Sequence, residues 1–172
     1  MTETQNAHEH TPRMQMAKVA PEVYKAVLAL EIAAKKGLDP ALVELVKIRA
    51  SQINHCAFCI DMHTKDAIAA GESVERIVLL PAWEESRHFY TEKELAAIEL
   101  TEAVTVLTGG TSRTESGGGF VPDEVYEKAA KHFEERELAQ LIAVIATINV
   151  WNRIGVTTRL VPGHYKPGMY KA

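Results

Sequence analysis

Apolar residues recur at helical spacing along nearly the whole chain, and no stretch alternates apolar and polar residues as a half-buried β-strand does. In the first such segment Val23, Val27 and Leu30 repeat every three or four residues, after Pro21 and before Gly37. Proline suits the first turn of a helix and glycine its end, so the pattern predicts a helix between them. The same signals return along the chain and predict an all-α fold.

The remaining helices are expected where caps and breakers enclose apolar periodicity. We expect them from about Asp39 to Ile53, Cys56 to Ala70, Ser73 to Leu80, Thr91 to Leu107, Pro122 onward and Glu134 to Leu160. Ser73 is expected to cap its helix, and Thr91 with Glu94 has the pattern of a capping box. The fold predicted is a helical bundle of about six to eight helices.

Two long helices of this bundle have similar sequences. ELVKIRASQIN, from Glu44, resembles QLIAVIATIN, from Gln140, and both end in Ile-Asn. We interpret this as a faint internal duplication with one redox-capable half and one structural half. The alternative, that apolar helices are alike by composition, stays open.

The chain of 172 residues is long enough for one domain with a sizeable core. We expect a flexible, polar N-terminal arm over residues 1–15, a helical domain over 16–161 and an irregular, Pro/Gly-rich tail over 162–172. The Gly-rich stretch 108–119 is interpreted as a flexible loop between two helices.

The composition argues against several classes of protein. The arm lacks the apolar core of a secretory signal, and no apolar run approaches the ~20 residues of a membrane span, so we expect a cytoplasmic protein with no membrane partner. With 19 basic and 23 acidic residues the formal net charge is −4, and Lys and Arg are scattered rather than striped. That distribution gives no indication of a nucleic-acid surface.

The two cysteines of the chain lie three residues apart in the stretch QINHCAFCIDMHTKDA, which begins at Gln52. A disulfide between Cys56 and Cys59 would close almost no loop, so a structural disulfide is not expected. On a helix both cysteines share one face with His63, which lies ~6 Å along the axis from Cys59 and ~10 Å from Cys56. Thiolate is the nucleophilic form of cysteine, and a neighbouring imidazole favours it. We therefore expect His63 to be the base for Cys59.

Glu44 lies twelve residues before Cys56, too far along one continuous helix to reach it. Asn54 offers a break, because Asn disfavours helix interiors and caps the following helix. If the chain reverses there, the two helices pack antiparallel and Glu44 comes level with His63. A carboxylate at that place would orient the imidazole or exchange protons with it.

A metal site is the main alternative for this cluster. Zinc takes four ligands, and the nearby candidates are Cys56, Cys59, His63 and His55. His55 and Cys56 are adjacent and point apart on a helix, so we expect no bound metal. The motif is not C-x-x-C-H, which argues against covalent haem. Asp61 and Lys65, four residues apart, are most simply a surface ion pair.

The stretch ELVKIRASQINHCAFCIDMHTKDAIAAGE, residues 44–72, resembles the core motif of the AhpD-like alkylhydroperoxidases, which belong to the carboxymuconolactone decarboxylase superfamily. That motif is a Glu, a C-x-x-C pair and a His four residues later, and all are present at matching spacing. Other stretches, such as VLLPAWEES from Val78 and IATINVWNRIGV from Ile145, extend the resemblance over residues 16–161. Some AhpD proteins carry a His between the two cysteines, where this chain has Phe58.

The resemblance implies an all-helical, oligomeric enzyme, commonly a trimer or hexamer, that reduces peroxides with its cysteine pair. By the same resemblance Cys59 is the peroxidatic cysteine and becomes a sulfenic acid, and Cys56 resolves it to the disulfide. His63 and Glu44 form the proton relay. No cofactor is bound; an external dithiol on a lipoyl-bearing or thioredoxin-like protein restores the pair. The superfamily's decarboxylases lack the cysteine pair, which argues against lactone chemistry here.

A second hypothesis comes from another class of protein. The same cysteine pair would also suit a non-enzymatic redox-sensing or stress-response scaffold, which would be oxidised once and turn over slowly. For either class we expect a homo-oligomer, because the aromatic side chains of Trp83, Tyr90 and Trp151 exceed what one small helical subunit buries comfortably.

Overall fold

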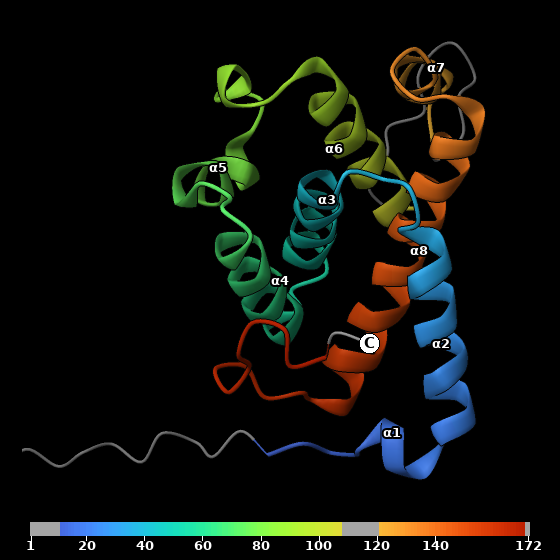
Figure 1. Ribbon diagram of the computed structural model, residues 1–172, viewed down its shortest axis with the longest axis vertical. Coiled ribbons are helices and arrows are strands. Elements are labelled where there is room, and N and C mark those ends of the chain that lie inside the picture. The colour runs from blue at the N-terminus through green and yellow to red at the C-terminus, as the bar shows by residue number, and fades with distance from the viewer. Residues whose placement is uncertain (1–10, 108–120, 171–172) are drawn as a thin grey trace, which may run out of the picture.

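The computed structural model describes residues 11–107 and 121–170. Over these residues the chain forms eight α-helices and two 3-10 helices with no β-strand (Figure 1), so the all-α prediction is confirmed. The helices are α1 (Met16–Val19), α2 (Pro21–Ala34), α3 (Pro40–Ile53), α4 (Ala57–Ala69), α5 (Val74–Leu79), α6 (Glu92–Thr105), α7 (Asp123–Ala130) and α8 (Glu135–Thr158). The 3-10 helices are Leu80–Ala82 and Arg87–Phe89. Residues 1–10 of the predicted arm and the predicted loop 108–119 lie outside the described residues.

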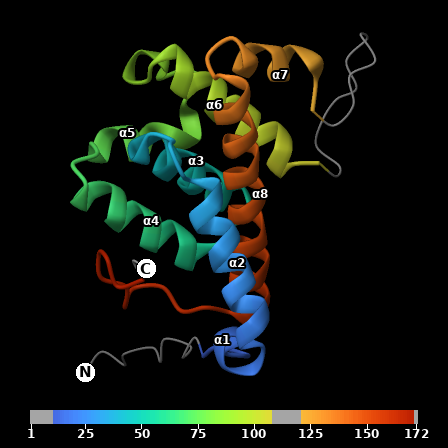
Figure 2. The ribbon, with the colours of Figure 1, turned by 45° about the vertical axis from the view of Figure 1, so that its right-hand side comes forward.

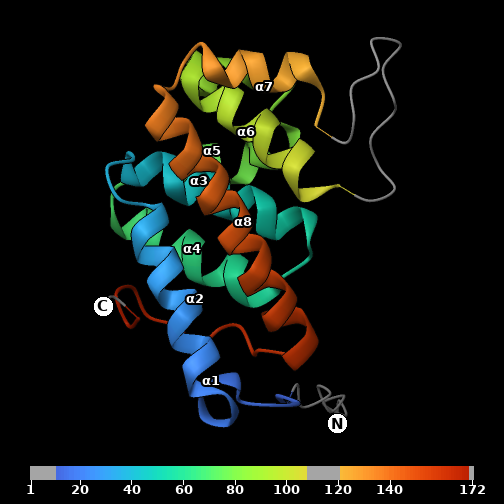
Figure 3. The ribbon, with the colours of Figure 1, turned by 90° about the vertical axis from the view of Figure 1, so that its right-hand side faces the viewer.

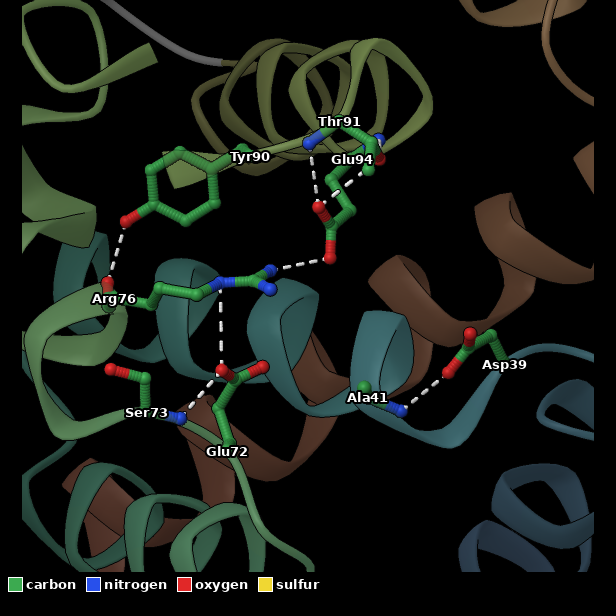
Figure 4. Close-up of polar contacts among 8 residues, drawn as sticks. All are labelled: Asp39, Ala41, Glu72, Ser73, Arg76, Tyr90, Thr91 and Glu94. Atoms are coloured by element: carbon green, nitrogen blue, oxygen red, sulfur yellow. Dashed lines mark hydrogen bonds and ion pairs between the residues drawn. The ribbon is translucent and has the colours of Figure 1, made fainter. Parts of the chain in front are cut away.

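Local capping explains several helix starts. The Asp39 carboxylate accepts a hydrogen bond from the Ala41 N–H at 2.8 Å and caps α3. Thr91 and Glu94 form the predicted capping box of α6 (Figure 4), with the Thr91 N–H donating to the Glu94 carboxylate at 2.8 Å. Each of these contacts satisfies a backbone N–H that has no partner within the helix.

The predicted side-chain cap of α5 is not formed. Ser73 precedes the helix, but its side chain makes no capping hydrogen bond. Its N–H instead donates to the Glu72 carboxylate at 2.7 Å (Figure 4). Glu72 and Glu94 both bind Arg76 of α5, and the Tyr90 hydroxyl donates to the Arg76 carbonyl oxygen. These contacts fasten α5 to the start of α6.

The long helix α8 is the centre of the bundle. It contacts α2, α3, α4, α6 and α7. Figures 2 and 3 show α2 beside it and α3 crossing it. By length and composition α8 would also be able to cross a membrane, so the prediction that no apolar run approaches that length is wrong. Within the bundle 44% of its most apolar window is buried.

Three clusters of buried side chains make up the core. The largest joins α2, α3, α6, α7 and α8, and a second lies under α5. Trp83 and Tyr90 are buried in the second, so one chain does bury these two aromatics, contrary to the sequence-based expectation. The third cluster is small and holds both cysteines with Ala50 and Ile148.

The tail after α8 crosses back over α4 (Figures 1 and 2). Arg159 ends α8 in the left-handed conformation with φ 58°. The Gly163 N–H then donates to the Asp61 carboxylate at 2.9 Å, and the Tyr165 hydroxyl donates to the Asp66 carboxylate at 2.7 Å. Asp61 also pairs with Lys65, as predicted, at 2.7 Å. The described part of the predicted irregular tail is therefore non-helical but bound along its length.

Candidate active site

A short turn between α3 and α4 sets the position of the first cysteine. Asn54 ends α3, His55 takes a positive φ of 55°, and Cys56 is the residue immediately before α4. The chain reverses in this turn, as predicted, so α3 and α4 lie against each other. Cys56 thus stands at the N-terminal end of a helix, where backbone N–H groups favour negative charge.

The two sulfurs are close together and almost fully buried. The Sγ atoms of Cys56 and Cys59 are 2.8 Å apart, and both cysteines are free thiols. Only 1% of Cys56 and 3% of Cys59 is exposed. Phe58 and Trp151 pack against this cluster, and Trp151 makes an edge contact with Tyr24 at a ring-centre distance of 5.1 Å.

The two thiols have opposite electrostatic environments. A hydrogen bond from the Cys59 thiol lowers the pKa of Cys56 to about 7, against the effect of burial. Backbone N–H groups of Cys59 and Phe58 and the amide of Asn152 lower the pKa of Cys56 further. The same pairing, with burial and the charge of Cys56, raises the pKa of Cys59. When the pair ionises, these surroundings favour the negative charge on Cys56 and the remaining proton on Cys59.

His63 and Glu44 form the second pair of the site. His63 Nδ1 lies 2.8 Å from Glu44 Oε2, so the contact expected from the chain reversal is present. His63 is buried, with 6% exposure. Burial alone would raise the pKa of Glu44, but the hydrogen bond and charge of His63, with smaller effects of Lys47 and Lys35, lower it below its ordinary value. The carboxylate therefore stays ionised and orients the imidazole.

Among the described residues no hydrogen bond links the cysteine pair to the pair formed by His63 of α4 and Glu44 of α3. Lys47 of α3 is 3% exposed and paired with Glu31, and its charge lowers the pKa of both Cys59 and Glu44. The structure thus brings Cys56 to Cys59 and Glu44 to His63, with a buried cation acting on both pairs.

Helix α8 supplies residues that the sequence did not single out. A Cβ added at Gly155 would lie 3.0 Å from Cys56 Sγ and 3.8 Å from Cys59 Sγ, so any larger residue there would require the Cys56 sulfur to shift. Asn152 is fully buried and donates to Ser51 Oγ at 2.9 Å. Two asparagines and a glycine are poor helix formers, and their presence inside one apolar helix is the sequence signal by which these residues could have been found.

The zinc alternative finds no support in the geometry. Within residues 11–107 and 121–170 there is no group of three His, Cys, Asp or Glu side chains that would hold a metal ion. His55, the fourth candidate ligand, is exposed, whereas Cys56, Cys59 and His63 are buried.

The fold and site define an all-helical protein with a free C-x-x-C pair at the start of one helix and a His–Glu pair beside it. Residues 21–103 match the model of the carboxymuconolactone decarboxylase family. The chain is 40% identical over 145 residues to the uncharacterized protein YdfG of Bacillus subtilis (strain 168). This match covers 84% of this chain and 92% of YdfG. The chain therefore belongs to the carboxymuconolactone decarboxylase family, and to its AhpD-like proteins.

Other relatives share smaller parts or lower identity. The uncharacterized protein YnjA of Escherichia coli (strain K12) is 30% identical over 113 residues, 66% of this chain and 56% of YnjA. A crystal structure of a protein of unknown function from Agrobacterium tumefaciens, described as a putative antioxidant defence protein AhpD, is 38% identical with a TM-score of 0.79, over 90% of this chain and 100% of that one. An uncharacterized peroxidase-related protein from Ralstonia eutropha JMP134, with an AhpD core, shares the fold at 16% identity and TM-score 0.69, over 87% of this chain and 75% of that one.

Proposed function

We propose that the protein is a thiol-dependent peroxidase of the alkyl hydroperoxide reductase type. The observation that carries this proposal is the pair of free thiols at the start of α4, with sulfurs 2.8 Å apart, together with His63 further along α4 and its partner Glu44 on α3. The 38% identical structure described as a putative antioxidant defence protein AhpD supports the same chemistry.

The reaction assigned to the pair has two steps. The Cys59 sulfur attacks one oxygen of the hydroperoxide, the O–O bond breaks, and the leaving alkoxide takes a proton to become an alcohol. Cys59 is now a sulfenic acid. The Cys56 sulfur attacks it, an S–S bond forms and water leaves. Peroxide has gained two electrons, and the dithiol has become a disulfide.

Proton movement follows from the two pairs. In the resting state Cys59 donates a hydrogen bond to the Cys56 thiolate, and moving that proton across 2.8 Å gives the Cys59 thiolate that attacks. Glu44 holds Nδ1 of His63, so Nε2 is the nitrogen that gives a proton to the departing oxygen, from the protonated imidazolium form of the ring.

The cycle needs an external reductant and no bound cofactor or metal. A dithiol such as dihydrolipoyl, or a thioredoxin-like protein, attacks the Cys56–Cys59 disulfide through a mixed disulfide and leaves oxidised, which restores both thiols. Such donors are held reduced in the cytoplasm, which is the compartment we propose. The working form is proposed to be a homo-oligomer.

The redox-sensing scaffold remains the second candidate because one observation favours it. Both sulfurs are almost fully buried, at 1% and 3% exposure, which impedes a bulky protein donor. A sensor would be oxidised by peroxide but reset slowly, whereas an enzyme resets on every cycle.

Steady-state peroxide consumption with dihydrolipoamide tests the proposal. We expect turnover in the wild type, none in Cys59→Ser and a clear loss in His63→Gln. His132→Gln is the matched control, because this histidine is exposed at the end of α7 and should leave turnover unchanged. A single equivalent of peroxide consumed per chain, with no further turnover, would favour the sensor.

A further inference from the structure

One face of α8 forms a wall against the two sulfurs. Ile148 shares the small core cluster with both cysteines, and Gly155 approaches Cys56 Sγ so closely that an added Cβ would lie 3.0 Å away. Asn152 lies four residues after Ile148 and three before Gly155, which places it on the same face of the helix. A polar amide therefore stands in the one stretch of α8 that contacts the thiol pair.

The orientation of the Asn152 amide is fixed by a chain of hydrogen bonds that begins at a charged donor. Arg153 can only donate, and its Nη1 lies 2.8 Å from Asn149 Oδ1. Asn54 Nδ2 donates to that same oxygen at 2.9 Å and to Asn152 Oδ1 at 2.9 Å. The nitrogen of Asn152 must then be the atom that faces Ser51 Oγ at 2.9 Å.

An amide nitrogen carries two N–H groups, and the bond to Ser51 uses one of them. Asn152 is 0% exposed, so no water outside the protein accepts the second. Asn152 shares its helix face with Gly155, which closely approaches both sulfurs, and the hydrogen bond of Asn152 lowers the pKa of Cys56 and opposes the rise in the pKa of Cys59.

We propose that Asn152 is a positioning residue for the thiol pair, which holds the turn before Cys56 through Asn54 and Ser51 and donates its second N–H to the charged sulfur. This role for Asn152 deepens the peroxidase proposal and rests on it. The disulfide carries no negative charge, so this hydrogen bond stabilises the dithiol state more than the oxidised state. Oxidation of the pair releases two electrons to peroxide, and reduction takes two from the dithiol donor. Asn152 therefore sets how readily both half-reactions run.

The test compares variants of two asparagines that share Asn54 as a partner. Asn152→Ala removes one acceptor of Asn54, the bond to Ser51 and the N–H beside the sulfurs. Asn149→Ala removes the other acceptor of Asn54 and the bonds of Asn149 to Thr105 and Arg153, but no N–H beside the sulfurs. We expect Asn152→Ala to raise the midpoint of the cysteine alkylation profile by about one pH unit, a tenfold change in ionisation. Asn149→Ala should leave the midpoint in place.

The reduction potential gives a second reading of the same variants. Equilibration with glutathione buffers should show Asn152→Ala lower by about 30 mV, which corresponds to a tenfold change in the dithiol–disulfide equilibrium. Asn152→Leu keeps the branched shape of the amide without its N–H groups, and it carries the test if the alanine variant does not fold. Equal shifts in the Asn149 and Asn152 variants, or no shift in either Asn152 variant, would overturn the proposal.

Neither reading requires peroxide turnover, so the outcome is separable from the fate of the proposed function. A wild type that does not consume peroxide, together with a raised alkylation midpoint in Asn152→Leu, would leave Asn152 as the positioning residue of a redox pair with another oxidant. Turnover in the wild type, with an unchanged alkylation midpoint and reduction potential in the Asn152 variants, would support the peroxidase function and overturn the role proposed for Asn152.

Discussion

Cys56 and Cys59 differ in what surrounds them, although they are three residues apart. The backbone N–H groups in the first turn of α4, the Cys59 thiol and Asn152 all donate to Cys56, so its pKa falls to about 7. The pKa of Cys59 rises because it gives its hydrogen bond to Cys56, because burial disfavours its charged form, and because the charge of Cys56 lies beside it. The expectation that Cys59 is the peroxidatic sulfur stays a prediction, and it requires the shared proton to move between them.

The hydrogen bond between the thiols has its own pH signature. Cys59→Ala removes the donor, so the pKa of Cys56 should rise from about 7 toward its ordinary ~8.5. A thiol below its pKa is protonated and unreactive, so Cys56 alkylation at pH 7 should slow by about tenfold. Cys59→Ser keeps an O–H donor and should retain a midpoint closer to that of the wild type. Identical profiles for the alanine and serine variants would show that the pairing does not set the pKa of Cys56.

At the scale of elements, the tail beyond α8 covers the site on α4. Leu160 lies beside the sulfurs, since its Cδ1 is 3.6 Å from the Cβ position of Gly155. The centre of the Tyr170 ring is 6.5 Å from that of Phe58, the residue before Cys59 in the sequence. The Tyr170 ring also stacks on the Tyr165 ring at a centre-to-centre distance of 5.5 Å. Burial and Asp66 raise the pKa of Tyr165 to about 12, so its hydrogen bond persists across neutral pH and is lost only as pH rises through that value.

Weakening the tail should therefore expose the thiols. Tyr165→Phe removes the hydrogen bond to Asp66, which contributes about 1 kcal/mol, so the tail should open about five times more often. Alkylation of the cysteines by a bulky maleimide should accelerate by a similar factor. Tyr126→Phe, at an exposed tyrosine of α7, is the matched control. Equal maleimide rates in both variants would mean that the tail does not limit access.

At the scale of the whole molecule, the surface retains apolar residues that one chain does not cover. Val23 and Leu30, which lie seven residues apart on one face of α2, are 44% and 45% exposed, and Val19 at the end of α1 is 68% exposed. These residues, rather than the buried Trp83 and Tyr90, now carry the expectation of a homo-oligomer.

Light scattering at micromolar concentration checks this expectation. The wild type should give a multiple of 19.0 kDa, and Val23→Lys with Leu30→Lys should reduce the mass toward one subunit. Val78→Lys, at an apolar residue of α5 that is 68% exposed, should not change the mass. A wild-type protein with the mass of a monomer would contradict the expected homo-oligomer.

Sequence reasoning worked where signals are local. Prolines, the Thr91–Glu94 box and helical spacing located α2 to α8 to within a few residues but not the short α1, and the turn at Asn54 placed Glu44 against His63. It did not find Asn152 or Gly155, because their contact with the cysteines joins segments about a hundred residues apart. Asp61 and Lys65 were predicted as a surface pair, and the tail they also hold was not foreseen for the same reason.

Peroxide trapping in the two single-cysteine proteins tests the central claim most directly. Cys56→Ser should, after one equivalent of peroxide, carry one sulfenic acid on Cys59, because no second sulfur remains to displace water. Dimedone capture followed by peptide mass spectrometry locates the oxygen, and the wild type treated alike should show the Cys56–Cys59 disulfide. Oxidation confined to Cys56 in the Cys59→Ser protein would reverse the roles of the two sulfurs. Peroxide that leaves the wild type and both variants unmodified would contradict the peroxidase chemistry itself.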